Sequence, residues 1–255
     1  MSELDKIDGL NDKAKAIIRS LDSLESDKTQ MDYLAHSPTA INMLNRYADK
    51  NGTMNVVGSD KEVGYMYSNS PDSIGNINIG TEIVDGKNIY LTIDTIIHEV
   101  GHALGAHNKL VQNVKNNIQD VTLNEYVDAY NLTEVDAAVA QYQVFKENQK
   151  FRENNPQSDI GNMKSDFEIY HSKTKDKFEE IAKDYIEKTG KDPFLDRDFW
   201  EGNSTDKQKI IDTLKEFRGN LVPVSQKDVD EKDALTYSDI SKINFLKEQV
   251  GLNFF

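Results

Sequence analysis

The sequence predicts a mostly helical α+β fold, and three observations carry that prediction. Long stretches in both halves of the chain repeat apolar residues at the spacing of an amphipathic helix. Residues 54–80 instead show the alternating pattern and the turn-forming clusters that are typical of short strands. The chain has 255 residues, which is long enough to bury a substantial core. We therefore expect a small sheet beside one buried helix, followed by a helical C-terminal region.

Two helices are expected before the sheet. Residues 3–25 and 38–49 alternate apolar and charged positions at helical spacing. Ser37-Pro38 is a typical helix start, because proline favours the first helical position. Three short strands should follow, and glycine, asparagine and serine clusters separate them. They are Met54–Val57, Val63–Tyr67 and Ile74–Gly80.

The next expected helix has an apolar stripe that would face the core. Thr92 or Asp94 can cap its start. Gly101 lets another backbone approach closely, and Gly105 can end the helix in a left-handed turn. The stripe consists of Ile93, Ile96, Ile97, Val100 and Leu104.

Helices also dominate the rest of the chain. Residues 121–149 form one long helical stretch, and Pro156 follows a polar run that breaks it. We therefore expect a core domain over residues 1–156 and a helical region over 157–255 that packs on it. Further helices are predicted within the second region, over 163–188, 207–217 and 238–250.

The buried helix carries the pentapeptide His98-Glu99-Val100-Gly101-His102, which has the HExxH pattern. Residues i and i+4 of a helix lie on one face, so both imidazoles can reach one metal ion. Glu99 lies about 100° round the helix from His98, so it can flank the metal without binding it. A chance match in a chain of this length is expected about once in a hundred. The pattern predicts Zn²⁺ as the cofactor, with His98 and His102 as ligands and Glu99 as general base.

Residues 98–105, His-Glu-Val-Gly-His-Ala-Leu-Gly, and the apolar lead-in resemble the active-site helix of the zincin metallopeptidases. The resemblance covers about residues 75–145 and implies a zincin-like fold. It also implies that the strand before this helix, Ile77–Gly80, is a sheet edge that binds substrate in extended form. A small peptidase of this kind resembles bacterial effector and toxin peptidases in general style.

Zinc needs a third protein ligand, and the zincin subgroups differ in what supplies it. The metzincin pattern places a third histidine six residues after the second, where this chain has Asn108; His107 is one residue early. The gluzincin pattern supplies a glutamate from a later helix. Glu134-Val135-Asp136-Ala137 is similar to its Glu-x-x-Ala element, so Glu134 is ranked first. The alternatives that stay open are Glu125, Asp136 and His107.

The resemblance also points to supporting residues. Thr133 is expected to cap a helix that begins near Glu134, with small residues after it that suit tight packing on another helix. A metal-bound histidine usually donates its second ring nitrogen to a carboxylate or carbonyl, and Asp128 or Asp136 could accept it. Candidates that could stabilise an oxyanion are Tyr126, Tyr130, Tyr142 and His171.

Composition narrows the partners and the location. The absence of cysteine excludes disulfides and leaves His and carboxylate as the only strong zinc ligands. A formal charge of -14 argues against nucleic acid or an anionic membrane as a partner. The first residues lack a basic region followed by an apolar run, which predicts a cytoplasmic location or secretion without a cleaved signal peptide.

The expected function is that of a zinc-dependent metallopeptidase, with an endopeptidase favoured, acting on a protein or peptide substrate. Two alternatives stay open at this point. One is a catalytically inactive zincin-fold binding protein that keeps the site without the reaction. The other is a zinc amidase that acts on a small or cell-wall substrate, which sequence does not separate from a peptidase.

Overall fold

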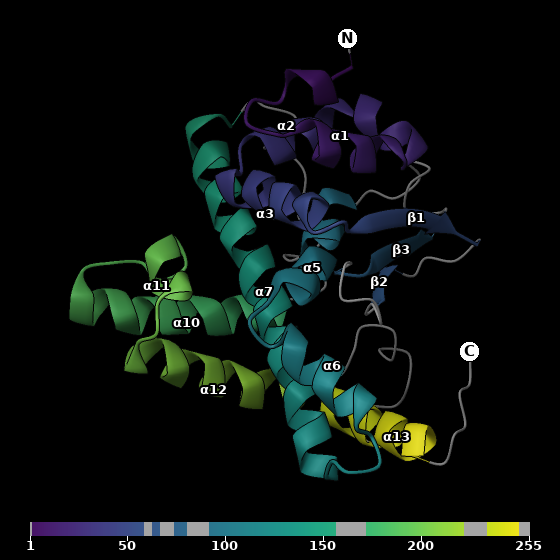
Figure 1. Cartoon of the computed structure of the whole chain (residues 1–255). Coiled ribbons are helices and arrows are strands. Elements are labelled where there is room, and N and C mark those ends of the chain that lie inside the picture. Colours follow the sequence, from purple (N-terminus) through teal and green to yellow (C-terminus); the bar gives the residue numbers. More distant parts are fainter. Residues whose placement is uncertain are drawn as a thin grey trace. The chain divides into compact units, whose positions relative to one another are not determined.

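The computed structural model describes residues 2–58, 63–66, 74–80, 92–156, 172–221 and 234–249. Within these ranges the chain forms helices and one three-stranded mixed sheet (Figure 1). The predicted α+β, mostly helical class is therefore confirmed. None of the described helices combines the length and the apolar character needed to cross a membrane.

The N-terminal stretch forms more helices than the two that were expected. Asn11 accepts a hydrogen bond from the Ala14 amide and so begins a first short helix inside the expected range 3–25. The expected helix over 38–49 is confirmed, with Ser37 as its cap and Pro38 at its first position. The elements are η1 (Leu4–Lys6), α1 (Asp12–Arg19), η2 (Asp22–Ser26), α2 (Lys28–Ala35) and α3 (Pro38–Asp49).

The sheet consists of β1 (Thr53–Val57), β2 (Val63–Met66) and β3 (Asn76–Gly80). Its order is β1-β3-β2, with β3 parallel to β1 and antiparallel to β2. All three predicted strands are therefore confirmed over their described residues; Tyr67, the last residue of the second predicted strand, lies outside them. The expectation that Ile77–Gly80 is a sheet edge is wrong, because both sides of β3 are hydrogen-bonded to neighbouring strands and offer no free edge to a peptide.

Helix α5 (Thr92–Leu104) lies beside this sheet, in contact with β2 and β3 and with α2 and α3. Ile93, Ile96, Ile97 and Val100 are fully buried, as their spacing predicts. Asp94 does not cap the helix, because it lies inside the first turn, where its carboxylate accepts from the Tyr33 hydroxyl. The amide of Ile93 donates instead to the side chain of Gln30.

A short helix α6 (Asn108–Asn116) leads to the long helix α7 (Leu123–Asn154). The predicted helical stretch over 121–149 is confirmed, but Thr133 does not begin a helix. It lies inside α7, where its hydroxyl donates to the carbonyl of Tyr130. The helix begins earlier, where Thr122 and Glu125 bond reciprocally in a capping box.

The described part of the C-terminal region is helical, as predicted. The expected helices over 207–217 and 238–250 correspond to α12 and α13, and the end of 163–188 corresponds to α10. The first part of 163–188 lies outside the described residues. The elements are α10 (Ser172–Thr189), α11 (Arg197–Glu201), α12 (Thr205–Gly219) and α13 (Tyr237–Gln249).

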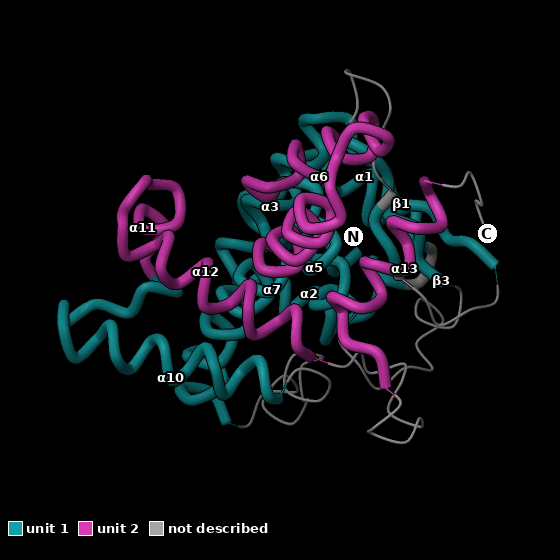
Figure 2. The backbone as a smooth tube through the Cα atoms, turned by 90° about the horizontal axis from the view of Figure 1, so that it is seen from below, with its two compact units in different colours: residues 1–104, 137–195 teal, residues 105–136, 196–255 magenta. Residues whose placement is uncertain are grey.

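The chain divides into two compact units, coloured separately in Figure 2. Unit 1 comprises residues 1–104 and 137–195, and unit 2 comprises residues 105–136 and 196–255. Helix α7 is continuous across the division at residue 136. The predicted domain boundary between residues 156 and 157 adjoins a stretch outside the described ranges and stays a prediction.

Candidate metal centre

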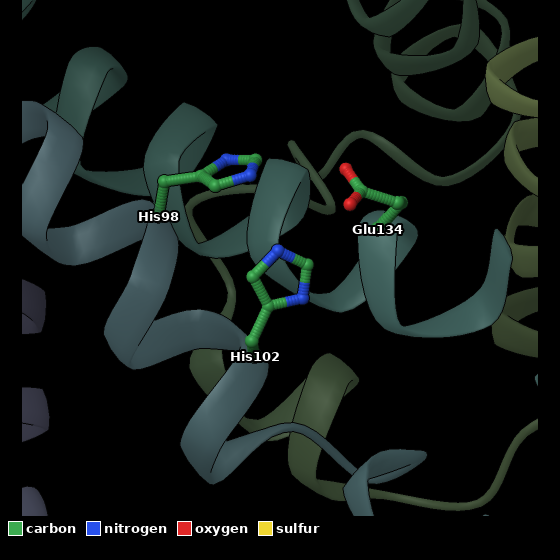
Figure 3. Close-up of side chains that lie close together, drawn as sticks. All are labelled: His98, His102 and Glu134. Atoms are coloured by element: carbon green, nitrogen blue, oxygen red, sulfur yellow. The ribbon is translucent and has the colours of Figure 1, made fainter. Parts of the chain in front are cut away.

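Three potential metal ligands come together in the fold. One ligand atom each from His98, His102 and Glu134 lie within 4.8 Å of one another. Figure 3 shows the two imidazole rings and the carboxylate pointing toward a common space. Among the described residues, these three side chains form a group that could hold a metal ion.

Helix α5 supplies the two histidines because they are four residues apart on one face. Their ring centroids are 4.9 Å apart, with the rings nearly perpendicular. His102 is buried and His98 is partly exposed. The apolar stripe packs the helix into the core, so the backbone that carries both rings is held rigidly.

Helices α5 and α7 approach closely beside this pair. A Cβ atom added at Gly101 would lie 2.6 Å from Cα of Ala137 and 3.2 Å from Cβ of Ala140. Only a residue without a side chain fits here, as the sequence suggested for Gly101. Glu134 is three residues before Ala137, hence one turn along the same helix face. The close crossing thus helps to bring this carboxylate within reach of the histidines.

His98 lies at one end of a chain of hydrogen bonds between buried polar side chains. Its Nδ1 lies 3.3 Å from Oε1 of Gln141, whose Nε2 donates to Oδ2 of Asp94 over 3.3 Å. The Tyr33 hydroxyl donates to the other oxygen of Asp94 over 3.1 Å. A bond at Nδ1 leaves Nε2 as the ring nitrogen that can bind a metal ion.

Glu134 is held by an arginine. Nη2 of Arg218 donates to Oε2 of Glu134 over 2.8 Å, and the arginine side chain is only 2% exposed. The guanidinium carbon lies 5.1 Å from the ring centroid of Tyr237, in a cation–π contact. The carboxylate therefore has a charged partner that limits its rotation.

Glu99 follows His98 on α5 and is 8% exposed. It is not a member of the three-residue ligand group. Its position fits a residue that lies beside a metal ion without binding it, as the helix geometry predicts.

The alternative ligands His107 and Asp136 are bonded to each other instead. The carboxylate of Asp136 accepts from the backbone amide of His107 over 2.9 Å and lies 3.0 Å from its Nδ1. Gly105 does not adopt the expected left-handed conformation. It is needed for space, because a Cβ there would lie 2.6 Å from Cβ of Asp136.

The remaining acidic candidates also have other partners. Glu125 caps the N-terminus of α7, and hydrogen bonds from the backbone amide and hydroxyl of Thr122 hold the pKa of its carboxyl below the usual range. Asp128 is exposed and pairs with Lys215 over 3.4 Å. Asp128 or Asp136 was expected to accept from a metal-bound histidine, but the residue that contacts Nδ1 of His98 is Gln141.

The candidate oxyanion residues lie in aromatic clusters. Tyr126 stacks on Tyr130 at 4.6 Å, and its hydroxyl donates to Glu248. Tyr142 packs against Phe178 at 4.6 Å. Burial raises the pKa of Tyr130 and that of Tyr142 well above the usual range. His171 lies outside the described residues, so its role stays a prediction.

Two supporting residues were missed from the sequence. Gln141 lies seven residues after Glu134, a spacing that returns to the same helix face, and this signal could have identified it. Arg218 is 84 residues from Glu134 and gave no local signal.

Comparisons with protein-family models, with curated proteins and with solved structures found no match for the chain.

Proposed function

We propose that this chain is a zinc-dependent metallopeptidase that hydrolyses peptide bonds. The observation that carries the proposal is the convergence of His98, His102 and Glu134, in which a distant carboxylate joins the two histidines of an HExxH helix. Chance can produce the pentapeptide, but it does not explain a third ligand brought from another helix to the same place.

The donor set fits zinc. Two imidazole nitrogens and one carboxylate oxygen form the His₂Glu ligand set of several catalytic zinc sites. Structural zinc sites are usually closed by four protein ligands, whereas catalytic sites have three and keep one position open. Of the described residues, three contribute to the group. Three is the number of protein ligands that catalytic zinc sites use.

When bound, zinc would polarise the substrate carbonyl and make water acidic enough to lose a proton near neutral pH. Glu99 would accept that proton and deliver it to the leaving amine, which requires a carboxylate beside the ligands and outside the ligand set. Gln141 and Arg218 would hold His98 and Glu134 in place.

The test compares Glu99→Gln with His102→Ala. Zinc content, zinc affinity and cleavage of denatured casein and of a mixed peptide library are measured for each variant. Glu99→Gln should keep stoichiometric zinc and lose cleavage by about 100- to 10,000-fold, whereas His102→Ala should lose zinc as well. Full activity of Glu99→Gln would contradict the mechanism. Stoichiometric zinc in the wild type without cleavage of any probe would contradict the peptidase assignment and favour a binding protein.

A further inference from the structure

The side chain of Gln141 makes two hydrogen bonds of opposite polarity, one through each half of its amide. We propose that Gln141 and Asp94 are positioning residues that fix His98 in the tautomer that binds the metal ion. The inference rests on the metal site of the proposed function and is independent of the reaction that the site performs.

The polarity of this chain of hydrogen bonds follows from Asp94. In the proposed arrangement Asp94 is ionised, and an ionised carboxylate has no proton to donate, so it only accepts. It receives the Tyr33 hydroxyl on Oδ1 and the Gln141 amide nitrogen on Oδ2. The NH₂ half of Gln141 must therefore face Asp94, which leaves Oε1 to face His98. Because Oε1 also only accepts, Nδ1 of His98 must carry the proton. The neutral ring then has its lone pair on Nε2, the nitrogen that binds the metal ion in the proposed site.

Burial makes this polarity hard to reverse. The side chains of Tyr33, Asp94 and Gln141 are all at most 1% exposed. Bulk water is therefore excluded from these three residues and does not compete for the amide or the carboxylate. A reversed amide would place Oε1 against the Asp94 carboxylate, and two facing acceptors in a buried site are costly.

Two helices supply both the ligands and their positioning groups. Asp94 and His98 are four residues apart on α5, so they share a helix face. Glu134, Ala137 and Gln141 have the spacing i, i+3, i+7 on α7 and form one stripe. Gly101 on α5 and Ala137 on α7 are in contact where these two helix faces pack together. Helix α7 thus provides one metal ligand and, two turns later, the group that orients another.

The proposal makes an unusual prediction for Asp94→Asn. The new amide at position 94 can donate as well as accept, so it no longer requires Gln141 to present its NH₂ half. The Gln141 amide can then rotate and offer a donor to Nδ1 of His98, which stabilises the tautomer with the proton on Nε2. In that tautomer the nitrogen that would bind the metal ion carries a proton instead. The substitution should therefore weaken metal binding although residue 94 is not a ligand.

The experiment measures zinc affinity by competition with a chromogenic chelator, and His98 protonation by ¹⁵N NMR of the metal-free protein. The wild type should carry the His98 proton on Nδ1. Gln141→Leu and Asp94→Asn should bind zinc about 10- to 100-fold more weakly, the range found when such partners are removed. Asp94→Asn should also shift the His98 proton toward Nε2. Tyr33→Phe should have a smaller effect, because Gln141 still donates to Asp94.

Asn148→Leu is the matched control. Asn148 is a second buried amide on α7, 1% exposed, whose side chain donates to the backbone carbonyl of Val144. Its loss should lower stability and leave zinc affinity and the His98 tautomer unchanged.

Two results would overturn the proposal. One is a wild-type His98 with its proton on Nε2, a measurement that remains possible even if every variant fails to fold. The other is unchanged zinc affinity in folded Gln141→Leu and Asp94→Asn proteins. A protein that binds zinc as described and cleaves no peptide would overturn only the proposed reaction.

Discussion

Gly101 on α5 lies directly against the backbone of Ala137 on α7, so that a Cβ at position 101 would lie 2.6 Å from Cα of Ala137. Because Cα of Ala137 is a backbone atom, it can move only if a helix moves. The two helices that carry His98, His102 and Glu134 are therefore spaced by the absence of one side chain.

Gly101→Ala should separate these helices and loosen the ligand group. Overpacking costs about 1–3 kcal/mol, and the better helix propensity of alanine returns at most about 1 kcal/mol. We expect the free energy of unfolding to fall by about 1–2 kcal/mol and zinc affinity to fall with it. Denaturant unfolding and zinc competition measure the two effects. Gly64→Ala is the control, since a Cβ there meets nothing within 4 Å. If Gly101→Ala kept the stability and zinc affinity of the wild type, the contact with Ala137 would not determine the geometry of the ligand group.

Glu134→Gln tests the third ligand. The amide keeps the shape of the side chain and loses the negative charge that would bind zinc in the proposed site. Zinc affinity should therefore fall by about 100-fold or more, beyond the effect of removing an indirect partner. The matched variant is His107→Gln, which removes the bond to Asp136 and should leave zinc affinity unchanged. If His107→Gln weakens zinc binding and Glu134→Gln does not, the site uses three histidines.

Arg218→Met should destabilise the metal-free protein, because it leaves the Glu134 carboxylate without its charged partner. Breaking a fully buried ion pair costs about 3–5 kcal/mol, and since Glu134 is 25% exposed we expect about 2–3 kcal/mol. Combining it with Glu134→Gln should recover part of this loss in a double-mutant cycle. Arg46→Met, at an exposed position on α3, should change stability by less than about 0.5 kcal/mol. Equal losses from Arg218→Met with and without Glu134→Gln would show that the pair is not coupled.

The capping box of α7 should make stability depend on pH. Hydrogen bonds from Thr122 hold the pKa of Glu125 below its ordinary value of 4.5. The folded state therefore favours the charged form, and this stabilisation is present above pH 4.5 and is lost as the pH falls through the folded pKa. The wild type should be more stable than Glu125→Gln near neutral pH, and the difference should disappear in acid. Unfolding curves over this range measure it. A difference that persists in acid would contradict the assignment.

Local patterns predicted much of the fold and half of the site. The stripe of α5, the three strands and the helices over 38–49 and 121–149 were all evident from the sequence, because each depends on residues close together in the chain. The predictions were wrong where the outcome depends on contacts between segments far apart in the chain. β3 is central because β1 and β2 flank it, and Asp94 bonds to Tyr33 and Gln141 instead of capping a helix.

The amino-acid pattern was enough to predict that one buried helix presents His98 and His102 on the same face, because helix geometry places residues i and i+4 together. It also placed several acidic residues on a later helix without choosing among them. The packing of the folded chain selects Glu134 as the acidic residue that lies beside the histidines, while Glu125 caps α7 and Asp136 accepts from His107. That choice depends on how α7 is positioned against α5 at Gly101 and Ala137, a contact between residues far apart in the chain.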